Sequence, residues 1–101
     1  MTKTDKKIDN AIRIALTSIC ESAKSEISGF KWLSHQVNFA KVNQTLTIRF
    51  MFDSHEDLNK ARAEGLISKL IVSTEQELAL DNIVLANAMK QCRFEVLPSN
   101  T

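Results

Sequence analysis

The chain has 101 residues, of which 44% are hydrophobic and 25% are charged, and its formal net charge is +1. This length and composition are typical of a single globular domain, so we expect one domain over residues 1–101. The small net charge provides no general attraction to nucleic acid or to acidic membranes. No stretch approaches the roughly 18 consecutive apolar residues of a membrane helix, so we expect no membrane segment and no membrane partner.

The two cysteines, Cys20 and Cys92, lie outside any CxxC or Cys/His pattern. No apolar signal segment precedes the first lysines. Together these features predict a cytoplasmic protein with reduced thiols, which act as small buried hydrophobic side chains.

An amphipathic helix is predicted over residues 5–28. Its apolar residues recur at three- and four-residue steps, so they should face the core. They are Ile8, Ile12, Ala15, Leu16, Ile19, Ala23 and Ile27. Thr4 or Asp5 can cap the start of this helix, and Gly29 suits the left-handed residue that follows a helix end.

A β-hairpin is predicted next, from two runs, 30–39 and 45–52, that alternate between the two faces of a strand. A short link with Asn43 as its best turn residue joins them. The apolar side of this ribbon holds Leu33, His35, Val37, Phe39, Leu46, Ile48, Phe50 and Phe52. The polar side holds Trp32, Ser34, Gln36, Asn38, Thr45, Thr47, Arg49 and Met51.

A helical segment should follow the hairpin. Ser54 can cap its start, with Asp57 three residues later in an approximate capping box. Helical spacing continues to about Leu80, interrupted by a kink or short loop near Gly65, because glycine is unfavourable inside a helix.

The last part of the chain leaves one alternative open. Residues 83–89 can form a short strand or a helix capped by Asp81, because short apolar runs do not separate the two cases. A strand is predicted over 92–97, with Cys92, Phe94 and Val96 facing inward and Pro98 ending it. The fold class is therefore α+β: an N-terminal helix, an antiparallel β-hairpin, a helical segment and a C-terminal strand or second hairpin. We expect two layers, with the helices on one face of a small antiparallel sheet.

The polar face of the hairpin is the candidate binding surface. It consists of Lys31, Trp32, Ser34, Gln36, Asn38 and Arg49. An aromatic side chain among hydroxyls, amides and a guanidinium suits a partner protein or stacked bases. In the alternative interpretation, Trp32 packs beneath a helix end and the rest is solvated sheet.

Catalytic and metal sites are not predicted. His35 is on the apolar side, where a hydrogen-bonded core or rim histidine is more common than a base or a metal ligand, and His55 is in the first turn of a helix. The chain has no GxSxG, HExxH, GxGxxG or P-loop motif, and the cysteines and histidines show no ligand spacing. Glu56 and Asp57 fit a helix start better than an acid/base pair. We therefore expect no enzyme activity, no cofactor and no metal.

Three segments resemble a family of small bacterial proteins loosely labelled Fis-family transcriptional regulators. They are TDKKID from Thr4, GFKWLSHQVN from Gly29, and FDS from Phe52 followed by Asp57-Leu58. The resemblance covers residues 4 to about 97, and the chain departs from the family at Phe94-Glu95-Val96, where an acidic segment is usual. It implies a strand at 83–85. The label implies DNA binding, but Fis-type regulators use a C-terminal helix-turn-helix, which the strand pattern here does not allow.

These features predict a non-enzymatic interaction or binding domain. Its partner would be another protein or a second copy of the chain in a homodimer. The alternative is a weak nucleic-acid-binding or regulatory module, for which only Lys31, Lys41 and Arg49 lie on the hairpin. The third hypothesis is a small enzyme or ligand carrier.

Overall fold

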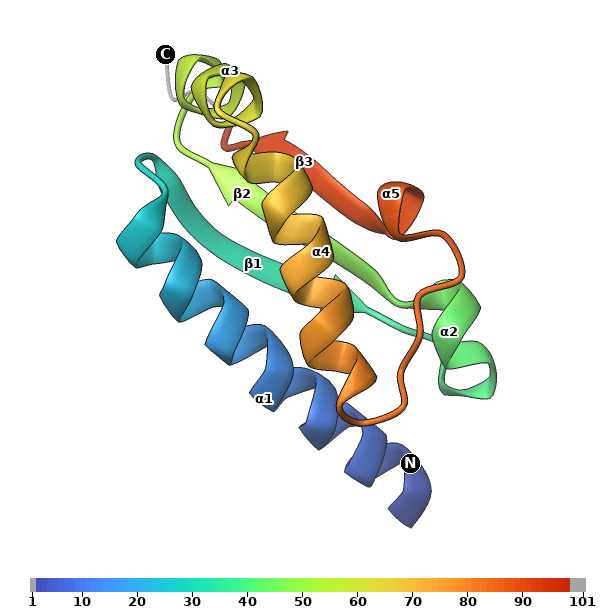
Figure 1. Cartoon of the computed structure of the whole chain (residues 1–101). Coiled ribbons are helices and arrows are strands. Elements are labelled where there is room, and N and C mark those ends of the chain that lie inside the picture. Colours follow the sequence, from blue (N-terminus) through green and yellow to red (C-terminus); the bar gives the residue numbers. More distant parts are fainter. Residues whose placement is uncertain (1, 99–101) are drawn as a thin grey trace.

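The computed structural model describes residues 2–98, which form helices and strands in an α+β arrangement (Figure 1). The helices are α1 (Lys3–Glu26), η1 (Phe39–Lys41, a 3-10 turn), α2 (Val42–Thr45), α3 (His55–Ala63), α4 (Leu66–Ala79) and α5 (Ala88–Gln91). The strands are β1 (Phe30–Gln36), β2 (Thr47–Phe52) and β3 (Cys92–Val96). The predicted α+β class is confirmed.

The three strands form one sheet in the order β1-β2-β3. β1 and β2 are antiparallel, as the hairpin prediction requires, but β3 runs parallel to β2. The sheet is therefore mixed, which corrects the expectation of a wholly antiparallel sheet or a second hairpin. Parallel neighbours need a long crossover connection, and here α3, α4 and α5 provide it.

The core lies between the sheet and the pair of helices α1 and α4, which run alongside each other on one face of the sheet (Figure 1). The alternating residues of β2 face these helices and are fully buried: Ile48, Phe50 and Phe52. Phe50 stacks on Phe94 of β3 with ring centroids 4.8 Å apart, so the parallel strand is packed into the same core. Stacked aromatic pairs add to the stabilisation that burial provides.

Helix α1 begins earlier than predicted. Thr2, not Thr4 or Asp5, is the cap: the Asp5 N–H donates to Thr2 Oγ1 at 3.0 Å, and the Asp5 carboxylate accepts from the Thr2 N–H. This reciprocal pair is a capping box, and its spacing moves the helix start by two residues.

No helix in the described part of the chain is both long and apolar enough to cross a membrane.

A β-bulge near the start of β1 decides which side chains enter the core. Phe30 pairs with Phe52, but Trp32 pairs with Met51, so Lys31 is an extra residue in β1. The extra residue reverses the alternation. As a result Phe30 is buried in the core, whereas Trp32 turns to the opposite face of the sheet.

The connection between β1 and β2 is longer than the predicted link at 40–44. The two strands are separated by η1 and α2, and β2 begins at Thr47 rather than at residue 45. Thr45 lies in α2, where its Oγ1 donates to the Lys41 carbonyl at 2.6 Å. The polar chemistry of Asn38 and Thr45 therefore builds this connection and does not extend the strands.

The start and the break of the second helical segment agree with the sequence. Ser54 caps α3, with its Oγ accepting from the Asp57 N–H at 3.1 Å. Gly65 lies between α3 and α4 with φ +75°, a left-handed conformation that glycine adopts without strain.

Residues 83–87 are neither strand nor helix, so the strand that the family resemblance implies at 83–85 is wrong. The only helix in 83–89 is the beginning of α5 at Ala88. Two hydrogen bonds to Asn43 hold this segment in place: the Val84 N–H donates to Asn43 Oδ1, and the Ala86 N–H donates to the Asn43 carbonyl. Ile83 and Leu85 are buried, and Val84 between them is exposed.

Candidate functional site

The face of the sheet opposite α1 and α4 is the candidate site, which we call the open face. Strand alternation places on it the side chains of Trp32, Ser34, Gln36, Thr47, Arg49, Met51, Arg93 and Glu95. In register, Trp32, Met51 and Glu95 form one row across the three strands, and Ser34, Arg49 and Arg93 form the next. The structure thus brings the predicted residues Trp32, Ser34, Gln36 and Arg49 onto one surface.

Trp32 is 43% exposed, which is unusual for the largest apolar side chain of a small domain. Its neighbour in register is Met51, which is only 8% exposed although it lies on the same face. Side chains directly opposite each other on antiparallel strands are close enough to shield one another. Trp32 and Met51 are therefore neighbours on this face, and the exposed part of Trp32 is accessible to a partner.

Two arginines share one carboxylate on the open face. Glu95 Oε2 lies 3.5 Å from Arg49 Nε and 3.7 Å from Arg93 Nε. Both distances are ion-pair contacts but too long for strong hydrogen bonds, and within the described residues this buried oxygen has no hydrogen-bond partner. The side chains of Arg49 and Arg93 are 50% and 59% exposed, so each guanidinium can also reach outward.

Beside this group lies a polar depression of about 260 Å³, lined by Ser34, His35, Gln36, Thr47 and Arg49. Hydroxyl, amide and guanidinium groups supply both donors and acceptors there. The depression suits the polar rim of an interface better than an apolar ligand.

Two predicted residues lie apart from these rows. Lys31 is exposed at the bulge, at the start of β1. Asn38 lies beyond the end of β1, where its Oδ1 accepts from the Ala40 N–H at 3.0 Å and caps η1. The structure gives the Asn38 side chain a local structural partner.

His35 is at the rim of the core, on the helix-facing side of β1. Its Nε2 lies 3.6 Å from Asp9 Oδ1, and Arg13 Nε donates to Asp9 Oδ2 at 2.7 Å. The hydrogen bond from Arg13 is the largest cause that lowers the pKa of Asp9 below its usual value, and desolvation opposes it. Within residues 2–98 no three His, Cys, Asp or Glu side chains are grouped closely enough to hold a metal ion.

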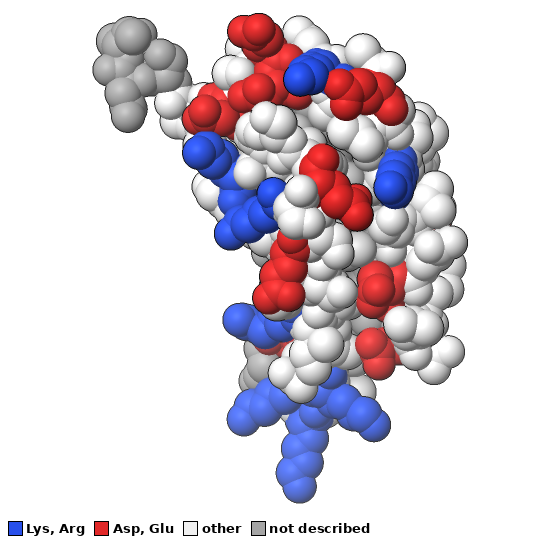
Figure 2. All heavy atoms as spheres, turned by 60° about the vertical axis from the view of Figure 1, so that its left-hand side comes forward, with Lys and Arg blue, Asp and Glu red and all other residues white. Residues whose placement is uncertain are grey.

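The lower end of the face in Figure 2 carries a cluster of blue side chains, whereas red and blue side chains are mixed over the middle and the upper end. Lys3, Lys6 and Lys7 are exposed in the first turns of α1, at the basic end. The basic end lies on α1 and not on the strands that carry Trp32, so the exposed lysines do not surround the aromatic side chain.

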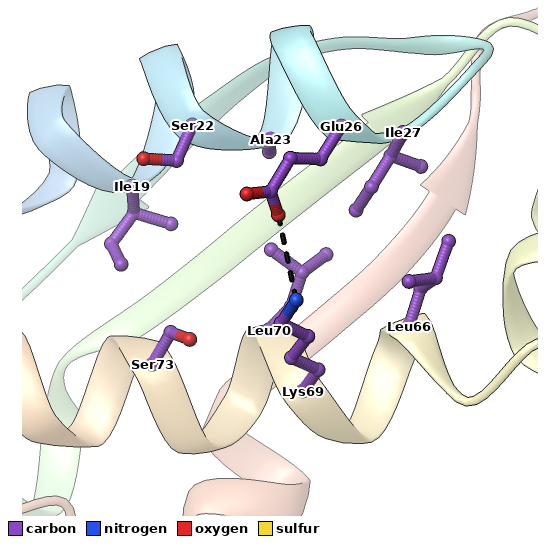
Figure 3. Close-up of a pocket in the computed structure, with 9 residues that line it drawn as sticks. All are labelled: Ile19, Ser22, Ala23, Glu26, Ile27, Leu66, Lys69, Leu70 and Ser73. Atoms are coloured by element: carbon purple, nitrogen blue, oxygen red, sulfur yellow. Dashed lines mark ion pairs between the residues drawn. The ribbon is translucent and has the colours of Figure 1, made fainter.

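A small, partly open cleft lies between α1 and α4 (Figure 3). Its volume is about 40 Å³, enough for about one water molecule. Apolar side chains form its floor, and Lys69 reaches across it to Glu26 at 3.7 Å. The cleft is a packing defect between two helices and is too small for a substrate.

Comparisons with protein-family models, with curated proteins and with solved structures find no match to this chain. The resemblance to the Fis-labelled family therefore depends on the sequence segments alone.

Sequence reasoning missed Arg93 and Glu95 as members of the open face. The signal was available, because Cys92, Phe94 and Val96 were expected to face inward and alternation turns the residues between them outward. What was lacking was the position of β3 in the sheet. Only its pairing with β2 brings Glu95 beside Arg49.

Proposed function

We propose that this chain is a non-enzymatic, cytoplasmic protein-interaction domain that binds a partner protein, or a second copy of itself, on its open face. The observation that carries the proposal is the half-exposed Trp32 beside Arg49 on the sheet face opposite α1 and α4. Tryptophan and arginine are the residues most enriched among the energetic hot spots of protein interfaces. The free thiols of Cys20 and Cys92 fit a reducing compartment.

The size of the open face limits the strength of the interaction. Three strands about 4.8 Å apart and about six residues long cover roughly 14 by 20 Å, or about 300 Å². A stable interface buries about 800 Å² on each partner. The open face alone therefore supports a transient complex, with a dissociation constant in the micromolar range or weaker.

The experiment compares two variants with a matched control. Trp32→Ala and Arg49→Glu should leave the circular dichroism spectrum and the melting temperature close to those of the wild type, since both side chains are exposed. Each should abolish self-association measured by sedimentation velocity, or binding of a purified partner measured by calorimetry. Ile14→Ala is the control, because Ile14 is also an exposed apolar residue but lies on α1. Binding by Trp32→Ala as tight as by the wild type would contradict the proposal.

A nucleic-acid-binding module is the second candidate, because Trp32, Arg49 and Arg93 lie on the same sheet face. Stacking of bases on an aromatic side chain and contacts from arginine to phosphate are common in single-strand binding. Glu95 opposes it, since its carboxylate lies between the two arginines. Titration with single- and double-stranded DNA at 50 and 200 mM salt separates the candidates, because phosphate contacts weaken steeply with salt.

A further inference from the structure

The outer edge of β1 is unpaired in the described part of the chain. β1 is the first strand of the sheet and pairs only with β2. An edge strand directs the N–H and C=O groups of alternate residues away from its neighbour, where another strand can pair with them. At the other edge of the sheet, β3 has α3 and α5 packed near it.

Helix α1 extends the helical layer beyond this edge. In Figure 1, α4 crosses in front of the sheet, whereas α1 runs along the outer side of β1. Two packed helices are together roughly 20 Å wide, and three paired strands are roughly 14 Å wide. The helical layer is therefore wider than the sheet by about one strand. The space for this additional strand lies beneath α1.

A groove of about 430 Å³ occupies that position. Its floor is formed by Leu16 and Cys20 of α1 and by Leu33 and His35 of β1. An added strand there would place every second side chain against this floor and the others on the open face. The floor is apolar at its centre, so a central side chain that points toward α1 should be apolar and no larger than valine or leucine.

The charged side chains along the groove indicate which residues a bound peptide should carry near its two ends. Lys24 and Arg13 line it from α1 and are 11 residues apart, which is about 16 Å along a helix. That distance matches four to six residues of extended chain. Arg13 uses Nε for Asp9, but its side chain is 68% exposed. An acidic side chain near each end of an extended peptide would therefore lie close to Arg13 or Lys24. Glu21 lies between these two cations on α1 and disfavours an acidic residue at the centre of the peptide.

We propose that this groove binds an extended segment of a partner protein as a fourth strand beside β1. The segment has an apolar centre and an acidic residue toward each end. A second copy of the chain does not fit, because pairing β1 with its own symmetry mate would bring two α1 helices over the same seam. The site is separate from the open face and does not depend on the function proposed for it.

The test uses a fluorescein-labelled peptide, Glu-Thr-Val-Thr-Val-Thr-Glu, and the full chain, with fluorescence anisotropy as the readout. Saturable binding is expected. Replacing the central Thr and the Val that follows it with Pro should weaken it at least about tenfold, because one of any two adjacent N–H groups faces the ladder and proline has none. A peptide with Lys in place of both Glu should bind the wild type at least about fivefold more weakly and should regain affinity for Arg13→Glu/Lys24→Glu.

Alkylation of Cys20 provides an independent readout, since its thiol lines the groove. The Glu peptide should slow the reaction of Cys20 with iodoacetamide, measured by mass spectrometry, and the Pro peptide should not. The variant Trp32→Ala/Arg49→Glu should bind the Glu peptide as the wild type does. This result would separate the outcome of the groove proposal from that of the open-face proposal.

No saturable binding up to 1 mM, on the order of the weakest peptide affinities, would overturn the proposal. Equal binding of the Pro peptide would also overturn it, because the contact would then not be a strand ladder. A wild-type dimer in which Cys20 is protected without peptide would identify a second copy as the occupant and overturn it as well.

Discussion

Gln91 Nε2 donates a hydrogen bond of 2.9 Å to the backbone carbonyl of Leu46, 45 residues away in the sequence. The same nitrogen donates to the Asn43 carbonyl at 2.9 Å, and Gln91 Oε1 accepts from the Asn87 N–H at 2.6 Å. One buried amide thereby joins the end of the crossover to the loop between β1 and β2. This contact sets the point at which β3 enters the sheet, because β3 begins at the next residue.

Replacing Gln91 with leucine should therefore destabilise the fold by about 2–3 kcal/mol, since it leaves buried backbone groups without partners. Urea denaturation followed by circular dichroism measures the change in the free energy of unfolding. Gln76→Leu is the matched control, because Gln76 is exposed on α4, and it should change stability by less than about 0.5 kcal/mol. A Gln91→Leu variant as stable as this control would show that the crossover is held by its apolar contacts alone.

The two glycines provide a second, internally controlled prediction. Both have positive φ, +84° at Gly29 and +75° at Gly65, but a side chain at Gly29 would overlap Asp57, whereas Gly65 faces open space. Gly65→Ala should cost about 1 kcal/mol from backbone strain alone. Gly29→Ala should cost about 3 kcal/mol, because the new methyl must also displace Asp57 from its bond with Ser54.

Thermal denaturation of both variants measures this difference. The comparison is informative because the backbone term is nearly the same at the two sites. Equal losses would mean that Asp57 moves aside at no cost, and that its contact with Ser54 does not support the start of α3.

The parts of the fold that could be predicted from the sequence are those determined by residues close together in the chain. The stripe of α1, the alternation of β2, the cap at Ser54 and the break at Gly65 each follow from local spacing or from one residue's conformational preference. Alternation also placed Trp32 on the polar side of the hairpin but left its exposure open. Trp32 lies on that side in the structure, because the bulge at Lys31 precedes it and left the later alternation intact.

The parts that did not follow depend on contacts between distant residues. Alternation in 92–96 predicts a strand but carries no information about its direction, which is set by the crossover through α3 and α4. The segment 83–87 is held by hydrogen bonds from the Val84 and Ala86 N–H groups to Asn43, and no local pattern reveals a partner some 40 residues away. The Arg49, Arg93 and Glu95 group was missed for the same reason, since it exists only when β3 pairs with β2.

Stability in acid should depend on Asp9. Its pKa is lowered in the folded chain, chiefly by the hydrogen bond from Arg13, so the unfolded chain binds this proton at a higher pH than the folded chain does. The carboxylate therefore stabilises the fold above its ordinary pKa of 3.8, and this contribution is lost as the pH falls through the lower, folded value. Urea midpoints of the wild type and Asp9→Asn, measured between pH 2.5 and pH 5, should converge as the pH falls. Parallel curves over this range would assign the acid sensitivity to other carboxylates.

The two thiols should differ sharply in reactivity. Burial, with a smaller contribution from Glu75, raises the pKa of the Cys92 thiol to about 11, and the side chain is buried at the start of β3. At pH 8 only about one Cys92 in a thousand is then a thiolate, the form that reacts. Cys20 is half-buried and lines the groove beside β1, so reagents can reach it. Reaction with a chromogenic disulfide at pH 8 should therefore show one fast thiol in the folded chain and a second only in urea.

The variant Cys20→Ser identifies the fast thiol, because it should remove that phase and leave the slow one. The slow phase should then follow the fraction of unfolded chain as urea is raised, since Cys92 reacts only when the core opens. A second fast phase in Cys20→Ser without urea would mean that β3 separates from β2 far more often than its buried contacts with Phe50 and Ile48 allow.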